Sequence, residues 1–419
     1  MTPHLTSQAD FSLAIKAVAQ ASQALRVAGA ECHSQLLEAM ANQLQAATDD
    51  ILEANTLDLE ASLEMAIPDV VLDWLKLTPE RLQNTLKMLK RLAALGDPRL
   101  LKIQSGGRLS PSLTSYGQVV PLGVVALVYE ALPELAVIMA GFCVRTGNGL
   151  ILKGGSEASQ THQVIMAALQ RAFQQSDLSP DCLLSLTEAE GEAARTWLLQ
   201  EPGIDLIIPY GRPGLVQQVI RQAAVPVLPT VIGNGYLYWA ASGKLATVIQ
   251  MVVDSHRGEP DAVNALEKIL VDAACSPSLL SQFCNSLWEG GFELLGDEAL
   301  VMEVAGLKLA KSADWSQPFL TKTVTLRRVD HLDAAANWIN QYGSGHVSAL
   351  VSDVHHEVCR FTQRVNSAAI YVNASPRFLR NPPQAANMAL GMTAQRGRCY
   401  GFVGLEALLT TQHVLQGLG

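Results

Sequence analysis

The strongest constraint on the fold is a regular alternation of short apolar runs with amphipathic stretches in the middle of the chain. The run GLILKG precedes the helical pattern SEASQTHQVIMAALQRAF, and DLIIP precedes PGLVQQVIRQAA and the short run VPVLP. Short apolar runs between longer segments of helical periodicity are typical of buried parallel strands linked by crossover helices. The pattern therefore predicts an α/β fold, with strands that include the run VPVLP at residues 225–229.

A second block of the same kind begins near Tyr236, so the chain is predicted to contain two α/β units that join near residues 229–240. The second block contains the helical patterns KLATVIQMVVDSH and LDAAANWINQYG and the strand patterns ALEKILVD, KTVTLRRV, HVSALVSD and SAAIYVNA. Residues 10–95 have helical spacing instead, and GGRLSPSLTSYGQVVPLGVVALVY is typical of a hairpin that leads into a buried strand. The tail GLEALLTTQHVLQGLG is predicted to be a strand that could pair with this hairpin.

Composition restricts the classes of function. Of the 419 residues 49% are hydrophobic and 16% charged, which excludes a disordered chain. The net charge of −9, without a basic run, argues against a nucleic-acid partner. The most apolar segment is interrupted by prolines and glutamates, and the N-terminus lacks a signal-peptide pattern. We expect a cytoplasmic protein with no membrane partner, and the seven dispersed cysteines predict reduced thiols without a metal site.

Several motifs together resemble one family. PLGVVALVYE, GNGLILKGGSEA, IDLIIPYG, VNALEKILV, INQYGSGH, AAIYVNAS and GLEALLTT are similar, in order, to blocks of the glutamyl-5-phosphate reductases (glutamate-5-semialdehyde dehydrogenases) of the aldehyde-dehydrogenase superfamily. The resemblance runs from about residue 10 to the end. It implies NADPH-dependent reduction of L-glutamyl 5-phosphate to L-glutamate 5-semialdehyde plus phosphate, in proline biosynthesis, through a cysteine thioester.

The resemblance also implies a domain organisation. We expect a dinucleotide-binding domain from residues 1–108 and 126–232, and a catalytic-type α/β domain from residues 233–378. A small β oligomerisation element would comprise residues 109–125 and 400–419.

The cofactor is expected at the end of the GLILKG run. Lys153 is followed by Gly154, Gly155 and Ser156 at a helix start, and the superfamily uses such a lysine and the residue three further on to hold the adenosine ribose. A serine can donate a hydrogen bond to a 2′-phosphate, so the pair favours NADP(H) over NAD. The alternative is a surface lysine beside a helix-capping serine.

A second candidate for the cofactor is Gly211, in the turn before a helix whose N-terminus could hold a pyrophosphate. The family has a basic residue and an extra glycine here, where this chain has Tyr210 and Arg212. The alternative for Gly211 is an ordinary turn.

The chemical site departs from the family pattern. The family block resembles R-P-S-V-C-N-A-L-E, whereas this chain reads Glu-Pro-Asp-Ala-Val-Asn-Ala-Leu-Glu, so Val263 stands at the position of the nucleophilic cysteine beside Asn264. Valine has no thiol and cannot form a thioester. The only alternative nucleophile we single out is Cys399, beside Arg398, because a nearby cation lowers the pKa of a thiol.

Charge changes accompany the loss of the thiol. Glu134, Glu259 and Asp261 add acids near family substrate positions, so we expect the cleft to repel an anionic acyl phosphate. Three residues still fit a substrate-binding segment of the family: Asn373, Ser375 and Arg377. Arg377 could meet a carboxylate, or it could be a solvated loop arginine.

Three functions are therefore open. The first is the family reaction, which describes the ancestry of the chain and its substrate class, but without the thiol we expect negligible turnover. Alternatively the chain is a pseudoenzyme, a non-catalytic paralogue that acts as a partner or regulatory subunit of glutamate kinase or of an active reductase. The third possibility is an NADP or small-molecule sensor, supported by Lys153 and Ser156. A homo-oligomer, or a hetero-oligomer with such a kinase or reductase, is expected.

Overall fold

The computed structural model describes residues 7–100, 104–110, 113–186, 191–383, 388–397 and 399–417. The chain divides into two compact units, of which the first comprises residues 1–230, 381–390 and 403–419 and the second residues 231–380 and 391–402. The chain first crosses between the units after Thr230. The roles of dinucleotide binding, catalysis and oligomerisation for the ranges given above stay predictions.

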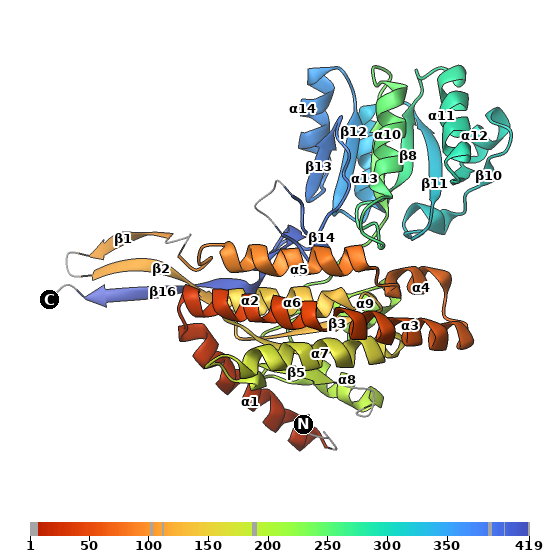
Figure 1. Ribbon diagram of the computed structural model, residues 1–419. Coiled ribbons are helices and arrows are strands. Elements are labelled where there is room, and N and C mark those ends of the chain that lie inside the picture. The colour runs from red at the N-terminus through yellow and green to blue at the C-terminus, as the bar shows by residue number, and fades with distance from the viewer. Residues whose placement is uncertain are drawn as a thin grey trace. The chain divides into compact units, whose positions relative to one another are not determined.

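The first unit is built on a parallel sheet of strand order β5-β4-β3-β6 (Figure 1). Every side chain of β3 is buried, as expected for a strand that is covered on both faces. The bounds are β3 (Val124–Tyr129), β4 (Gly149–Lys153), β5 (Leu183–Leu186) and β6 (Leu206–Tyr210).

Helices cover both faces of this sheet. Apolar side chains of α1, α8 and α9 pack with Val124, Ala126 and Val128, whereas α6 packs against β3 and β4 and against α2 and α5. The helical region expected at residues 10–95 consists of α1 (Gln8–Val27), α2 (Ala30–Ala46), α3 (Thr48–Glu64), α4 (Asp69–Leu75) and α5 (Pro79–Ala94). The others are α6 (Glu134–Thr146), η1 (Ser156–Ala158), α7 (Ser159–Gln174), η2 (Pro180–Cys182), α8 (Gly191–Gln200), α9 (Pro213–Gln222) and η5 (Leu405–Leu408).

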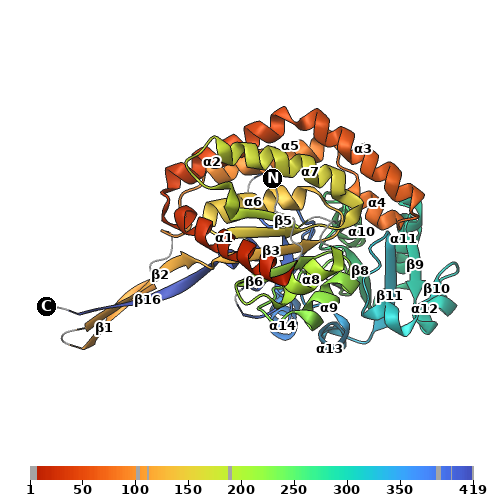
Figure 2. The same cartoon turned by 90° about the horizontal axis from the view of Figure 1, so that it is seen from below.

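A three-stranded antiparallel ribbon of order β1-β2-β16 also belongs to the first unit. It consists of β1 (Gln104–Ser110), β2 (Leu113–Pro121) and β16 (Leu409–Gly417). The predicted pairing of the C-terminal strand with the hairpin is confirmed, because β16 pairs with β2 from Leu409↔Pro121 to Gly417↔Leu113. The ribbon projects beyond the helices of its unit in both views (Figures 1 and 2).

The second unit contains a seven-stranded parallel sheet of order β10-β9-β11-β8-β7-β12-β13. Its strands are β7 (Gly235–Trp239), β8 (Leu266–Asp272), β9 (Glu293–Gly296), β10 (Lys308–Leu309), β11 (Thr323–Val329), β12 (Val347–Val351) and β13 (Ala369–Val372). Its helices are α10 (Leu245–Ser255), α11 (Pro277–Glu289), α12 (Glu298–Glu303), η4 (Ser312–Trp315), α13 (Leu332–Tyr342) and α14 (His355–Arg364). A separate pair is formed by β14 (Gly391–Thr393) and β15 (Gly401–Val403).

The elements predicted for the second block are confirmed, but one strand predicted for the first block is wrong. The run at residues 225–229 forms only a single parallel bridge, between Ile207 and Val227. Pro226 and Pro229 have no N–H to donate, so a regular ladder cannot continue there. Within the described ranges, every helix is too short or too polar to span a bilayer.

Candidate functional site

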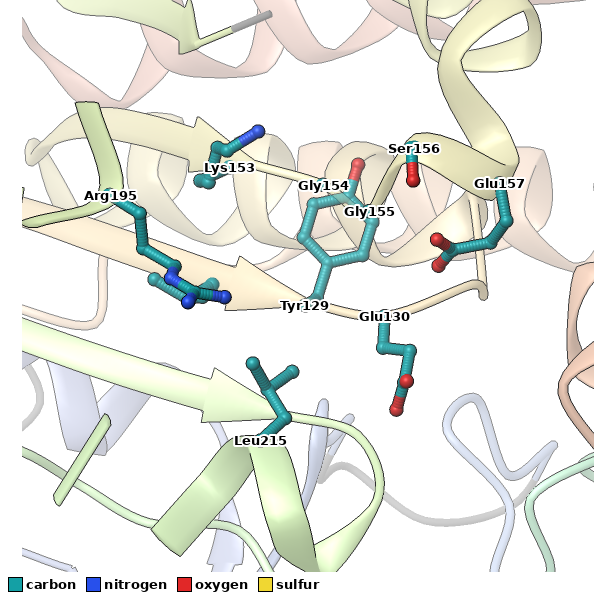
Figure 3. Close-up of a pocket in the computed structure, with 10 residues that line it drawn as sticks. Tyr129, Glu130, Lys153, Gly154, Gly155, Ser156, Glu157, Arg195 and Leu215 are labelled. Carbon is teal, nitrogen blue, oxygen red and sulfur yellow. The ribbon is translucent and has the colours of Figure 1, made fainter. Parts of the chain in front are cut away.

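The carboxyl ends of three parallel strands in the first unit open into one cavity. Val128 pairs with Lys153 and Tyr129 with Tyr210, so β3, β4 and β6 end at the same edge of the sheet. The cavity has a volume of about 370 Å³ (Figure 3). Its lining contains the four candidates Lys153, Gly154, Gly155 and Ser156, and also Val128, Tyr129, Glu130, Glu157, Arg195 and Leu215.

The two glycines keep part of the cavity wall free of side chains. A Cβ atom on Gly155 would lie 2.2 Å from both carboxylate oxygens of Glu157, and one on Gly154 would lie 3.1 Å from the hydroxyl of Tyr129. A larger residue at position 155 would therefore displace a side chain that lines the cavity.

Charge is divided between two ends of the cavity. Figure 3 shows the side chains of Lys153 and Arg195 on one side, and the carboxylates of Glu130 and Glu157 on the other. Burial raises the pKa of Glu157, against the opposing effect of its hydrogen bond from the backbone N–H of Ala131. Among the described residues that line the cavity, the cationic side chains thus lie at one end.

Arg195 is a cavity residue that the sequence motifs did not indicate. It lies on α8, whereas the other cation, Lys153, ends β4, and only the crossover connections bring them to one edge of the sheet. A Lys-Gly-Gly-Ser motif is visible as a local pattern, but an arginine in a helix more than one element away has no local signal.

Tyr129 is fixed beneath this wall by a buried chain of polar contacts. Its hydroxyl lies 2.7 Å from Nδ1 of His162, and Nε2 of His162 lies 2.6 Å from Oγ of Ser185. Burial lowers the pKa of His162 to about 4, so the imidazole is neutral near pH 7. The contacts hold the tyrosine ring against Gly154.

The turn at Gly211 lies beside the same cavity, and its helix start already contacts a carboxylate. Oε2 of Glu130 accepts a hydrogen bond from the backbone N–H of Arg212 at 2.9 Å, and Oε1 accepts from Nε of Arg212 at 2.9 Å. A Cβ atom on Gly211 would lie 2.9 Å from Cβ of Glu130. The glycine therefore permits the close approach of Glu130 to the first turn of α9.

In the second unit, Val263 is fully buried in the loop that precedes β8. Its carbonyl accepts a hydrogen bond from the backbone N–H of Gly233 at 2.9 Å and lies 3.1 Å from Nε2 of His346. Burial lowers the pKa of His346 to about 4. A neutral imidazole that donates from Nε2 leaves Nδ1 as acceptor, and Ser344 Oγ lies 2.6 Å from it.

Asn264 connects this loop to the segment that contains the other candidates. Its side-chain amide donates to the carbonyl of Pro376 at 2.9 Å, between Ser375 and Arg377. Ser375 Oγ accepts from the backbone N–H of Arg377 at 3.2 Å, and Arg377 Nη1 lies 3.4 Å from Asp254 Oδ1. The structure thus brings the two loops together, and Arg377 contacts the carboxylate of Asp254.

Asn373 has a structural use in this segment. Its side chain accepts from the backbone N–H of Ser352 at 3.0 Å and donates to the carbonyl of Ser352 at 2.8 Å. Cys399 is partly exposed, and its Sγ donates to the carbonyl of Phe402 at 3.1 Å. Its neighbour Arg398 lies outside the described residues.

The acids that were expected to repel an anionic substrate form ion pairs within the chain, and the repulsion itself stays a prediction. Arg380 donates from Nη1 to Glu259 at 2.8 Å and from Nη2 to Asp261 at 2.6 Å, and the side chain of Asp261 is 0% exposed. Glu134 is buried and pairs with Arg81. Glu134 pairs with its own arginine, whereas Glu259 and Asp261 share Arg380, so two carboxylates are matched there by one guanidinium.

Comparisons with known proteins agree with this architecture. Residues 1–258 match the aldehyde dehydrogenase family. The chain is 42% identical to gamma-glutamyl phosphate reductase 2 of Synechocystis, over 93% of each chain, and 35% identical to gamma-glutamyl phosphate reductase of Gloeobacter violaceus, over 97% of each. The crystal structure of gamma-glutamyl phosphate reductase from Thermotoga maritima has a TM-score of 0.88 at 26% identity, covering 97% of this chain and 98% of that one.

A more distant solved structure shares the fold alone. Propionaldehyde dehydrogenase of Rhodopseudomonas palustris has a TM-score of 0.72 at 10% identity, covering 97% of this chain and 96% of that one. The chain has the aldehyde-dehydrogenase fold and, within that class, belongs to the gamma-glutamyl phosphate reductase family.

Proposed function

We propose that this chain is a non-catalytic member of its family that keeps an NADP(H) site in the first unit. The observation that carries this proposal is the side chain at position 263, a fully buried valine in the loop where the family resemblance places the nucleophile. The family reaction, reduction of L-glutamyl 5-phosphate in proline biosynthesis, describes the ancestry, but its thioester step needs a thiol. Turnover is therefore negligible.

The cavity of the first unit supports the retained nucleotide site. Lys153 and Arg195 provide two cations and Ser156 a hydroxyl, which suit a ribose that bears a 2′-phosphate. Gly155 leaves space where a side chain would collide with Glu157. NADPH, when bound, would supply a hydride; the residues of this cavity would only bind and orient the nucleotide.

Two measurements on the purified full chain test the proposal. NADPH formation at 340 nm is followed with NADP, phosphate and glutamate 5-semialdehyde, with a cysteine-bearing reductase as positive control, and we expect no rate above background. NADPH binding is followed by its fluorescence, and we expect saturable binding. A rate that survives exhaustive purification contradicts the loss of catalysis, and Cys399→Ser then tests whether a relocated thiol carries it.

A regulatory role requires assembly with other chains, and the ribbon is our candidate surface. The strand β16 lies at one edge of the ribbon, and Leu415 on it is 60% exposed. A long edge strand with exposed side chains favours pairing with another chain. We expect light scattering to show a homo-oligomer, or a mixed complex with glutamate kinase or an active reductase; a monomer at every concentration and in both mixtures contradicts this role.

A further inference from the structure

We propose that the cavity of the first unit discriminates between two phosphate positions: Lys153 and Arg195 accept a phosphate at one end, and Glu130, locked to Arg212, opposes a diphosphate at the other. Glu130 is then a specificity-determining residue. This inference rests on the proposed NADP(H) site, but it makes predictions that the proposed site alone does not.

The first support is the geometry of the acidic end. Glu130 lines the cavity, its side chain is 15% exposed, and its two oxygens contact the backbone N–H and the guanidinium of Arg212. A carboxylate therefore already occupies the position at the start of α9 where an anionic ligand would be held. A diphosphate can reach the same donors only after Glu130 moves away.

The second support is the neighbour of Glu130. Glu157 directs its carboxylate toward the same end, where it accepts from the backbone N–H of Ala131 (Figure 3). Glu130 and Glu157 place two carboxyl groups at this end, and Arg212 pairs with Glu130. Lys153 and Arg195 place two cationic side chains at the opposite end. A ligand with a single phosphate beside the cations fits this distribution better than one with a further diphosphate beside the acids.

The test uses Glu130→Gln, which keeps the shape and an acceptor oxygen for the N–H of Arg212 but removes the charge. Dissociation constants are measured by calorimetry for 2′-AMP, NADP and NAD, with the exposed Glu64→Gln as matched control. Because the charge is lost and the guanidinium of Arg212 becomes available, E130Q is expected to bind NADP and NAD at least about tenfold more tightly, about 1.4 kcal/mol. Binding of 2′-AMP, which has no diphosphate, stays within about twofold.

Two further variants, one at each end of the cavity, are expected to change the dissociation constants of different nucleotides. Arg212→Ala leaves Glu130 without its cation, so NADP binds more weakly while 2′-AMP binding is unchanged. Arg195→Met weakens 2′-AMP and NADP by about tenfold and leaves NAD within about twofold, because only the first two have a 2′-phosphate. Thermal unfolding of each variant establishes that it is folded.

The outcomes separate this inference from the proposed function. Weaker or unchanged NADP binding by E130Q overturns the role of Glu130, and equal losses for NAD and NADP in R195M overturn the phosphate subsite. If the wild-type chain binds none of the nucleotides but E130Q binds NADP, the wild-type NADP site fails and the inference holds. If neither binds, both fail.

Discussion

Removing the guanidinium of Arg380 is expected to destabilise the second unit strongly. The side chain is 3% exposed and pairs with Asp261, which is 0% exposed, and with Glu259, which is 19% exposed. Arg380→Ala removes the guanidinium that pairs with the buried carboxylate of Asp261, and breaking such a pair costs about 3–5 kcal/mol. Arg377→Ala is the matched control, because its 3.4 Å contact with Asp254 joins side chains that are 40% and 29% exposed. An exposed pair contributes about 1 kcal/mol or less.

Urea unfolding followed by tryptophan fluorescence measures the difference. Four of the six tryptophans lie in the second unit, so the signal reports mainly on it: Trp239, Trp288, Trp315 and Trp338. Urea is preferable to guanidinium salts, which screen ion pairs. We expect the unfolding free energy of R380A to fall by about 3–5 kcal/mol and that of R377A by less than about 1 kcal/mol.

A double variant tests the cause. In Arg380→Met with Asp261→Asn, neither the buried cation nor its buried partner is charged, so we expect much of the stability lost in R380M alone to return. Equal stability losses for R380A and R377A, or no recovery in the double variant, would refute the assignment of this loss to an uncompensated buried charge.

Three other predictions concern single residues. Val263→Cys is expected to lower the unfolding free energy by about 1 kcal/mol, through lost apolar contact, and to raise NADPH formation at 340 nm above the wild-type level; no gain in rate would contradict it. The stability of the wild type relative to His162→Gln is expected to fall by up to about 3 kcal/mol as the pH drops from 6.5 to 4. In this interval His162 binds a proton in the unfolded chain but stays neutral in the folded protein, where burial lowers its pKa to about 4. Burial lowers the pKa of Lys268 to about 8, so the unfolded chain binds more protons between pH 8 and 10.5, and the stability of the wild type relative to Lys268→Met is expected to rise across that interval; a flat difference would contradict the shift.

Local patterns predicted the fold well because the buried strands and amphipathic helices of a parallel α/β fold each have a characteristic local sequence pattern. The apolar runs at β3, β4 and β6 each fill a strand whose side chains are buried on both faces, so each run is visible without knowledge of its neighbours. The cavity residues from Lys153 to Ser156 could be predicted equally well, because they lie at the end of β4 or directly after it. The α14 helix was missed because its sequence HHEVCRFTQR buries only Phe361.

Charge balance could not be predicted because it depends on distant partners. Arg380 follows Asp261 by 119 residues, and Arg212 follows Glu130 by 82. In the sequence the acids at positions 259 and 261 suggested repulsion of an anionic substrate, whereas in the structure they hold a buried arginine. A carboxylate counted without its tertiary partner overstates the local negative charge.

The loop around Val263, where the family resemblance places a cysteine, has a defined conformation. Ala262 has φ of 41°, in the left-handed region that a residue with a Cβ disfavours. That conformation is held by Arg380 on Asp261 and by the two contacts to the carbonyl of Val263, from Gly233 and His346. None of these contacts involves the side chain at position 263. A cysteine introduced there would therefore meet the same backbone, which is why one substitution is expected to restore measurable chemistry, and why loss of Arg380 is expected to abolish that gain.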